Sequence, residues 1–292
     1  LRAIPDGCYR FRDVMDDDGL GAVDIPIEVT LLVERGEINV DFTGTAAQVS
    51  GNINCPLSVA AAAVFYVFRC LMPAHTPACA GSFRAIHLSA PPACLVNAQR
   101  PAAVAAGNVE TSSRIVDVVM GALAQALPGR IPAASQGTMN NLAMGARAGD
   151  DSWDYYETMG GGTGGGSHQA GLHATQSHMT NTLNTPIEVL EMEFPLRVHR
   201  YQIRTGSGGA GKHPGGNGLL REFEFLAAAT VTLLTERRRQ SPWGLHAGAP
   251  GECGENRRNA EHLPAKFSGE FSAGERLTVA TPGGGGWGEV NE

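Results

Sequence analysis

Two apolar-rich stretches near the start of the chain show the extended pattern of strands. Ile25 to Val33 and Glu37 to Phe42 are rich in β-branched residues, which favour a half-buried strand. The three residues between them, Glu34-Arg35-Gly36, suit a tight turn because glycine tolerates hairpin backbone angles. The pattern predicts an antiparallel hairpin.

A longer apolar run, Leu57 to Met72, has the composition of a helix. It is rich in alanine, Asn54 and Pro56 suit a helix start, and Pro73 suits a helix end. Because the run is apolar almost all round, we expect this helix to be buried.

The clearest helical periodicity follows Asn108. Asn108 suits the N-cap, and Glu110 suits the first turn because its carboxylate complements the positive end of the helix dipole. Pro128-Gly129 then ends the helix. Its apolar positions recur at spacings of three and four: Ile115, Val118, Val119, Leu123, Ala126 and Leu127.

The second half of the chain is predicted to be mainly β. The fold class is therefore α+β, with mostly antiparallel sheet and a few buried helices. We expect a mixed α/β region over 1–150 and a glycine-rich, mainly β region over 151–292, separated by a turn near Ala146 to Asp151. The expected strands are 153–158, 197–204, 219–226, 230–235 and 276–280.

Composition excludes several functional classes. The 292 residues are 42% hydrophobic and 17% charged, with a formal net charge of −7 and no basic block, which argues against nucleic-acid binding. The longest strongly apolar run, Val59 to Phe68, is too short to span a membrane. None of the six cysteines forms a C-x-x-C pair, so we expect reduced, mostly buried thiols, such as Cys70, in a cytoplasmic protein.

Two motifs come close to known sites but lack a required element. Gly206 to His213 nearly matches a phosphate-binding loop, but His213 replaces the Ser or Thr that would hold Mg²⁺. Asp16-Asp17-Asp18-Gly19 lacks the alternating ligand spacing of a calcium loop, so we expect a solvated turn there.

One stretch combines several groups that can carry chemistry. Residues 155–182 hold an acid, three imidazoles including His178, and seven residues, Gly160 to Gly166, of which six are glycines. Imidazole exchanges protons near neutral pH, and a glycine loop can present backbone N–H groups to an oxygen. A glycine-rich connector with hydrogen-bonded histidines is the alternative.

Two further segments carry polar groups suited to a substrate. The helix start at Asn108 to Ser113 could hold an anionic group, although ordinary capping explains it equally well. The amides of Ser135 to Asn141 suit an amide or ring carbonyl, with a polar turn as the alternative.

Taken together in chain order, these segments resemble the hydantoinase B/oxoprolinase family over essentially the whole chain. The resemblance rests on Gly51-Asn-Ile-Asn-Cys-Pro56, Ala106-Gly-Asn-Val-Glu-Thr-Ser112, Ser135-Gln-Gly-Thr-Met-Asn-Asn141, Tyr156-Glu-Thr-Met-Gly-Gly-Gly162, His178-Met-Thr-Asn-Thr182, Gly206-Ser-Gly-Gly-Ala-Gly-Lys212, Glu236-Arg-Arg-Arg239, Pro242-Trp-Gly244 and Thr281-Pro-Gly-Gly-Gly-Gly-Trp-Gly288.

The resemblance implies the C-terminal portion of a catalytic subunit in a hetero-oligomer. Family chains are about twice as long, and the start at Leu1 is consistent with a fragment or a processed chain. The N-terminal half, or an equivalent chain, would bind a divalent metal such as Zn or Mn, and a hydantoinase A-like ATPase subunit would bind ATP and Mg²⁺.

The implied activity is ATP-dependent opening of a cyclic amide such as a hydantoin, a lactam or 5-oxoproline. A ketone carboxylase of the acetone or acetophenone type, or a non-catalytic scaffold, is the alternative. Gln176 stands where the family usually has histidine, and Ala170 where it usually has aspartate. These two departures weaken the transfer of a specific hydantoinase activity.

The resemblance and the residue chemistry together predict one shared cleft for a small molecule. His178 is the predicted acid/base group or substrate contact, and no metal ligand is assigned in this chain. The predicted polar contacts are Asn108, Glu110, Gln136, Asn140 and Asn181, and the predicted backbone cradle is Gly160, Gly161 and Gly162.

Overall fold

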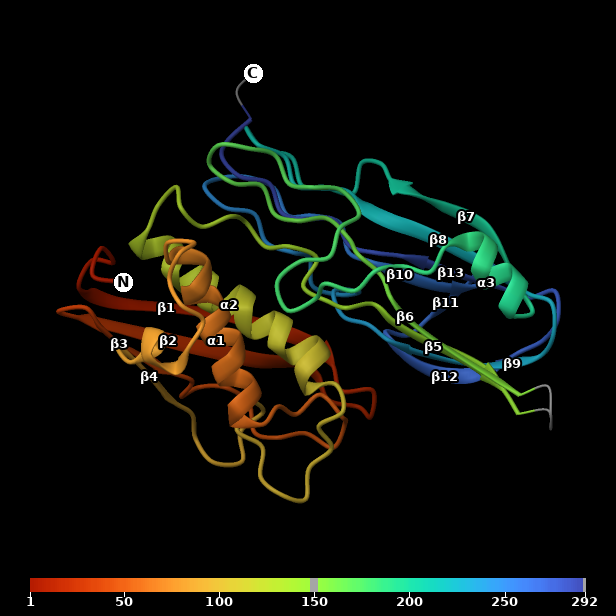
Figure 1. Ribbon diagram of the computed structural model, residues 1–292, viewed down its shortest axis with the longest axis horizontal. Coiled ribbons are helices and arrows are strands. Elements are labelled where there is room, and N and C mark those ends of the chain that lie inside the picture. Colours follow the sequence, from red (N-terminus) through yellow and green to blue (C-terminus); the bar gives the residue numbers. More distant parts are fainter. Residues whose placement is uncertain (148–151, 291–292) are drawn as a thin grey trace. The chain divides into compact units, whose positions relative to one another are not determined.

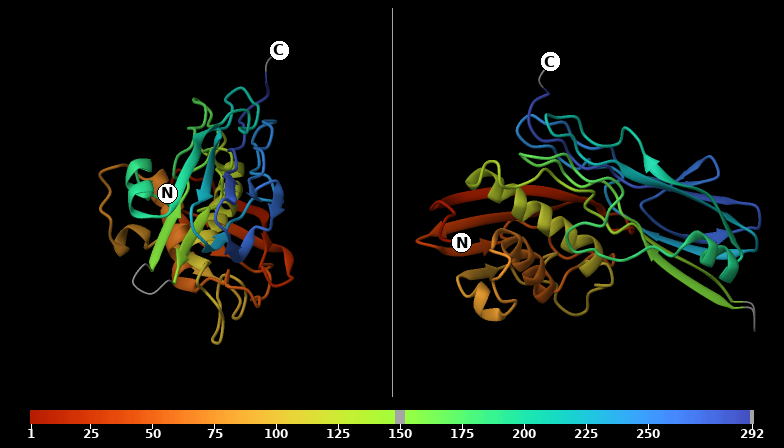
Figure 2. Two further views of the ribbon diagram at one scale, coloured as in Figure 1. Left: turned by 90° about the vertical axis from the view of Figure 1, so that its right-hand side faces the viewer. Right: turned by 45° about the horizontal axis from the view of Figure 1, so that its top comes forward.

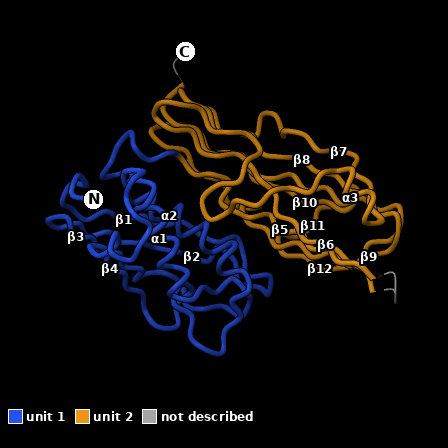
Figure 3. Tube along the Cα trace, viewed as in Figure 1, with its two compact units in different colours: residues 1–132 blue, residues 133–292 orange. Residues whose placement is uncertain are grey.

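The computed structural model describes residues 1–147 and 152–290 and is shown in Figure 1. The chain divides into two compact units, Leu1–Pro132 (unit 1) and Ala133–Glu292 (unit 2), shown in Figure 3. This boundary lies before the division at residue 150 that the sequence suggested, and most of the turn expected there falls outside the described residues. The α+β class predicted from the sequence is confirmed.

Unit 1 contains a four-stranded sheet in the order β1-β2-β3-β4. The predicted hairpin is confirmed: β2 and β3 pair antiparallel, with Val33 opposite Ile38. The strand β1, which sequence patterns did not predict, adds antiparallel to β2, and β4 adds parallel to β3. The strands are β1 (Gly7–Asp17), β2 (Val23–Glu34), β3 (Glu37–Asp41) and β4 (Ile86–Ser89).

Both helices of unit 1 lie on the same side of this sheet (Figure 2). The helix α2 (Ser112–Ala126) packs on β1, where Gln125 Nε2 donates to the Arg10 carbonyl at 2.6 Å. The helix α1 (Leu57–Leu71) packs against α2, and a short 3₁₀ turn, η1 (Ala80–Phe83), follows it. Of the two helices, α2 is buried on nearly every face.

The prediction that the first helix is buried holds for part of its surface. Only one face of α1 is buried in this chain, formed by Ala60, Ala63, Val64, Val67 and Phe68. Cys70, predicted to be a buried thiol, is exposed at the helix end. Apolar composition indicates a helix at α1, but the neighbours of each helix decide how much of it is covered, and α2 packs against α1 and against both β1 and β2.

The predicted N-cap at Asn108 is also wrong. A π-helical turn, η2 (Gly107–Thr111), precedes α2, and the Asn108 carbonyl accepts a hydrogen bond from Ser112 Oγ at 2.7 Å. Gly107 is packed so closely that a Cβ there would lie 2.3 Å from the Asn54 carbonyl oxygen. Tertiary packing at Gly107 thus starts the helical backbone one residue before Asn108, the position that side-chain capping favours.

The aspartates at the end of β1 do not form a solvated turn, because Asp16 and Asp18 are buried. Asp18 Oδ1 accepts hydrogen bonds from the Leu20 and Ala22 amides at 2.8 and 3.0 Å, and its Oδ2 accepts from the Gly51 amide at 3.0 Å. Burial alone would raise the pKa of Asp18, but these amide donors outweigh it and hold the pKa below its ordinary value.

Unit 2 is built from two antiparallel sheets, in the orders β11-β10-β13-β8-β7 and β12-β9-β5-β6, that enclose one apolar core. Phe223 and Leu277 from the first sheet and Leu142 and Val231 from the second are among its buried residues. The elements are β5 (Asn141–Ala146), β6 (Trp153–Thr158), α3 (Ile187–Glu193), β7 (Leu196–Arg204), β8 (Gly218–Phe225), β9 (Ala229–Leu234), β10 (Glu255–Arg258), β11 (Glu261–Leu263), β12 (Lys266–Phe271) and β13 (Arg276–Ala280).

Beyond the sheets, unit 2 contains a layer of glycine-rich backbone made by residues 160–166, 207–216 and 282–288, hereafter the glycine layer. Its segments bond to one another through backbone groups: the Gly216 amide donates to the Thr163 carbonyl at 2.8 Å, and the Gly284 amide to the Gly216 carbonyl at 2.9 Å. A Cβ on Gly216 would lie 1.8 Å from the Leu172 oxygen. Glycine is therefore required by close approach of backbones.

Within residues 1–147 and 152–290, the helices are too short or too polar to cross a bilayer.

Candidate functional site

The predicted contacts Gln136 and Asn140 lie together in unit 2, and both are fully buried. Asn140 Nδ2 donates to Gln136 Oε1 at 2.8 Å and to the Met159 carbonyl at 3.0 Å. The Asn140 backbone has a φ of +47°, a left-handed conformation that asparagine tolerates better than most residues. We call this group, with Arg238 and Asn256, the amide cluster.

Arg238 fixes the orientation of these side-chain amides. Its Nη1 donates to Asn140 Oδ1 at 2.9 Å, so the other end of that amide must be the donor. Asn140 Nδ2 then requires an acceptor on Gln136, which places Oε1 there and leaves Gln136 Nε2 as the remaining donor. Gln136 Nε2 is buried and has no hydrogen-bond partner. A buried, oriented N–H donor of this kind suits a carbonyl oxygen.

Arg238 is itself held on its other side. Its Nη2 donates to Asn256 Oδ1 at 2.9 Å, and Asn256 Nδ2 donates to Thr235 Oγ1 at 3.0 Å. Its Nη1 also donates to the Glu236 carbonyl at 2.8 Å. The guanidinium therefore acts as a fixed fork rather than a mobile charge.

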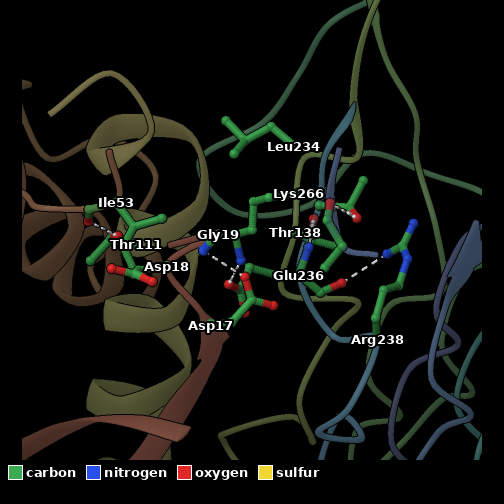
Figure 4. A network of polar contacts seen from close by, with 12 residues as sticks. Asp17, Asp18, Gly19, Ile53, Thr111, Thr138, Leu234, Glu236, Arg238 and Lys266 are labelled. Atoms are coloured by element: carbon green, nitrogen blue, oxygen red, sulfur yellow. Dashed lines mark hydrogen bonds and ion pairs between the residues drawn. The ribbon is translucent and has the colours of Figure 1, made fainter. Parts of the chain in front are cut away.

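Glu236 and Thr138 link the two segments that carry the amide cluster. Figure 4 shows Thr138 and Glu236 together with Arg238 and Lys266. Thr138 Oγ1 accepts from the amides of Asn140 and Glu236, each at 3.1 Å. The carboxylate of Glu236, which is fully buried, pairs with Lys266 Nζ. The threonine thus sets the spacing between residues 138–140 and 236–238.

Two of the three glycines predicted to form a backbone cradle, Gly161 and Gly162, use their amides within the protein. The Gly161 amide donates to the Thr175 carbonyl at 3.1 Å and the Gly162 amide to the Pro282 carbonyl at 3.0 Å, so both donors are taken up within the protein. A Cβ on Gly161 would lie 2.2 Å from Gln136 Oε1. Gly161 therefore makes room for the glutamine amide.

His178 and Asn181 lie in the loop that follows residues 160–166, the first segment of the glycine layer. Ser177 and Thr180 close a tight turn, with Thr180 Oγ1 donating to the Ser177 carbonyl at 2.6 Å. His178, within this turn, is half-buried and has a φ of +56°, while Asn181 is exposed. The loop is tied to β6, because Gln176 Nε2 donates to Thr158 Oγ1 at 3.2 Å.

Asn108 and Glu110 belong to unit 1. Asn108 is exposed, whereas Glu110 is fully buried in the turn η2. Nearby, Asn54 Nδ2 donates to three carbonyls, those of Val49, Gly51 and Ala103, each at 2.9 Å. Convergence of Asn108 and Glu110 with the residues of unit 2 stays a prediction.

The segment that resembles a phosphate-binding loop is part of the glycine layer. The Gly209 amide donates to the Gly284 carbonyl, and the Lys212 amide to the Gly288 carbonyl. No helix follows, because the chain enters β8 at Gly218. Since these two amides bond to backbone carbonyls, they are not available to a phosphate.

The cysteines and other metal ligands give no metal site in the part of the chain that the structure describes: no group of three or more His, Cys, Asp or Glu could hold an ion. All six cysteines are free, and burial raises the pKa of the Cys55 thiol to about 12. The residues described here therefore do not fit a divalent metal.

Sequence reasoning missed Arg238, the residue that orients the amide cluster. It stands in the Glu236-Arg-Arg-Arg239 motif, which contributes to the family resemblance and by itself indicates no function for any one arginine. Three consecutive arginines gave no sign of which one turns toward Asn140, 98 positions earlier in the chain.

Comparison with known proteins decides the family. The model of the Hydantoinase B/oxoprolinase family matches residues 1–290. This chain belongs to that family. A 5-oxoprolinase from Arabidopsis thaliana is 41% identical over 282 residues, covering 95% of this chain and 21% of that protein. An uncharacterized protein from Methanocaldococcus jannaschii is 40% identical over 272 residues, covering 92% of this chain and 48% of that protein.

Two solved structures share this fold. An ATP-dependent caprolactamase from Pseudomonas jessenii superposes with a TM-score of 0.86 at 25% identity, over 99% of this chain and 52% of that chain. An acetone carboxylase superposes with a TM-score of 0.81 at 17% identity, over 98% and 46%, which shows the fold alone. The chain spans about half or less of the length of these relatives.

Proposed function

We propose that this chain forms part of the catalytic subunit of an ATP-dependent cyclic-amide hydrolase that opens a hydantoin, a lactam or 5-oxoproline. The observation that carries the proposal is Gln136 Nε2, a buried donor without a partner whose direction is fixed through Asn140 and Arg238. It suits the carbonyl oxygen of a cyclic amide. Membership of a family that includes 5-oxoprolinases, and likeness to a caprolactamase, support the substrate class.

In this proposal ATP activates the amide oxygen. Transfer of the γ-phosphoryl group to that oxygen releases ADP and makes the ring carbon open to attack by water. Cleavage of the ring C–N bond then places a proton on the nitrogen, and a second water releases phosphate from the acyl phosphate. His178 would carry the proton between the attacking water and the leaving nitrogen, because imidazole exchanges protons near neutral pH.

The remaining parts of the active assembly would be supplied by other protein. ATP and Mg²⁺ would bind a hydantoinase A-like ATPase subunit in a cytoplasmic hetero-oligomer. A divalent metal would bind outside the residues described here, and no step above depends on it. Asn181 would contact the substrate beside His178, and the roles of Asn108 and Glu110 in unit 1 stay predictions.

The test is a substrate profile of the purified complex. ATP hydrolysis and product formation are measured with 5-oxo-L-proline, hydantoin and caprolactam, and in parallel with acetone plus bicarbonate. The proposal expects ring-opened product, formed with ATP hydrolysis, from at least one cyclic amide. Carboxylated ketone without any ring opening would overturn it in favour of the carboxylase alternative.

A further inference from the structure

A buried ion pair in unit 2 adjoins the loop that carries His178. Glu157 on β6 is 4% exposed and Arg221 on β8 is fully buried, and Glu157 Oε1 pairs with Arg221 Nη1. The second carboxylate oxygen accepts from Tyr155 Oη at 2.6 Å. A charge withdrawn from water is stable only where its partners are fixed, so this carboxylate has a defined position.

Arg221 is fixed by two aromatic rings as well as by Glu157. Its guanidinium carbon lies 4.5 Å from the centre of the Tyr201 ring and 4.9 Å from that of Phe223. These contacts stabilise a cation where water is absent. The ion pair is therefore anchored from both sheets of unit 2.

Asn184, at the far end of the His178 loop, is bonded directly to this anchored carboxylate. Its Nδ2 donates to Glu157 Oε1 and, at 3.0 Å, to the Thr158 carbonyl. Its Oδ1 accepts from Tyr201 Oη at 3.1 Å. The nitrogen of the Asn184 amide is thus held by Glu157 and by the next residue, Thr158, and its oxygen by Tyr201, whose ring contacts Arg221.

The near end of the loop is tied to the next residue of β6. Gln176 Nε2 donates to Thr158 Oγ1 and to Thr182 Oγ1, each at 3.2 Å, and the hydroxyls of Thr158 and Thr182 bond to each other. Residues 176–184 are therefore held at both ends by Glu157 and Thr158, with His178 between them.

We propose that Glu157 is the positioning residue for the His178 loop, acting through Asn184 and not touching the substrate. The inference rests on the proposed function, because it requires His178 to meet the substrate. A proton-transfer group must be held close to its reacting atoms, and a displacement of about 1 Å can cost about 100-fold in rate. An ion pair anchored in two sheets can supply that rigidity where a loop alone cannot.

The experiment measures hydrogen–deuterium exchange and kinetics on the full complex. Asn184→Ala cuts the link to Glu157 but leaves the ion pair intact. Asn259→Ala is the matched control, because Asn259 Oδ1 also accepts one hydrogen bond, from the Arg276 amide at 2.9 Å, in a turn of unit 2 outside the His178 loop. The double variant Glu157→Gln with Arg221→Met removes the carboxylate without leaving a buried charge unpaired.

We expect exchange in residues 177–183 to quicken about tenfold in Asn184→Ala and in the double variant, the equivalent of one hydrogen bond, and not in Asn259→Ala. With 5-oxo-L-proline as the probe, or whichever cyclic amide the wild type opens, kcat should fall about tenfold or more. Adding His178→Ala to Asn184→Ala should then cost less than His178→Ala costs alone.

The two proposals fail differently. Unchanged exchange in residues 177–183 of Asn184→Ala would overturn the positioning role of Glu157, whatever the activity. Exchange that quickens while kcat stays at the wild-type value would also overturn it, since a loosened loop would then not matter. If His178→Ala alone leaves kcat unchanged, the proposed function fails at His178, and the exchange result still reports separately on the loop.

Discussion

Arg238 Nη1 lies 2.9 Å from Asn140 Oδ1. This contact determines which end of the Asn140 amide accepts and which donates, and through Asn140 it does the same for the Gln136 amide. Asn140 can then donate only from Nδ2, and Gln136 can accept only at Oε1. The free donor Gln136 Nε2 is a consequence of an arginine that does not contact it. The candidate site is thus oriented by a residue outside the Ser135–Asn141 segment.

Replacing Gln136 with Met should reduce activity without reducing stability. An unpartnered buried N–H costs about 1–3 kcal/mol, so its removal should leave the free energy of unfolding unchanged or raise it. Loss of one hydrogen bond to the substrate carbonyl should lower kcat/KM about tenfold or more. Tryptophan fluorescence in urea and steady-state kinetics with 5-oxo-L-proline measure the two quantities. A destabilised variant of full activity would show that Gln136 is structural.

Two glycine-to-alanine substitutions should show separately how much stability depends on close backbone packing and how much on a positive backbone φ angle. In Gly216→Ala the new Cβ would lie 1.8 Å from the Leu172 oxygen, and we expect a loss of about 4 kcal/mol or failure to fold. In Gly206→Ala nothing lies within 4 Å, so only the strain of its φ of +86° remains, about 1–2 kcal/mol. All three tryptophans lie in unit 2, so their fluorescence follows its unfolding.

The helices α1 and α2 provide an internal control for that comparison. Both belong to unit 1, so far-UV circular dichroism at the helical band mainly reports unit 1. Gly216→Ala should shift the fluorescence transition more than the dichroism transition. If Gly216→Ala and Gly206→Ala lowered the stability of unit 2 equally, close backbone packing at Gly216 would not be what requires glycine there.

The lowered pKa of Asp18 predicts an acid-sensitive contribution to the stability of unit 1. A carboxyl whose pKa is depressed on folding stabilises the protein above its unfolded pKa of about 3.9, and that stability is lost as the pH falls through the lower folded value. Asp18→Asn should therefore be less stable than wild type at pH 6, and the difference should shrink below about pH 4.

Urea unfolding followed by circular dichroism between pH 2.5 and 6 measures this effect. Glu34→Gln, at an exposed position at the end of β2, is the control and should change the stability little at any pH. A constant difference between Asp18→Asn and wild type across the range would mean that the charge of Asp18 does not matter.

The sequence predicted the helices and strands better than it predicted how far each is buried and where each begins. The hairpin of β2 and β3 was evident from its own residues, because alternation and turn chemistry are local. Burial of α2 rather than α1 depends on what lies on either side, which no local pattern reports. The start of α2 likewise depends on Gly107 packing against Asn54, more than 50 positions away in the chain.

In the candidate site too, the sequence indicated the residues but not their surroundings. Residue chemistry singled out Gln136, Asn140 and His178, but it could not show which of their polar atoms are already bonded. The glycines 161 and 162 were expected to donate to a substrate, yet their amides bond within the protein. Glu157 stood out only as the acid of residues 155–182 and Arg238 only as one of three consecutive arginines, because neither pattern gives a sign of a distant partner.

The most direct test of the central claim is His178→Ala in the assembled complex, with cyclic-amide-dependent ATP hydrolysis and ring-opened product measured together. If this chain supplies the proton-transfer group, product formation should fall about 100-fold or more, and the complex should still assemble. Wild-type rates of ATP hydrolysis and ring opening in His178→Ala would contradict the account and favour a scaffold role for this chain.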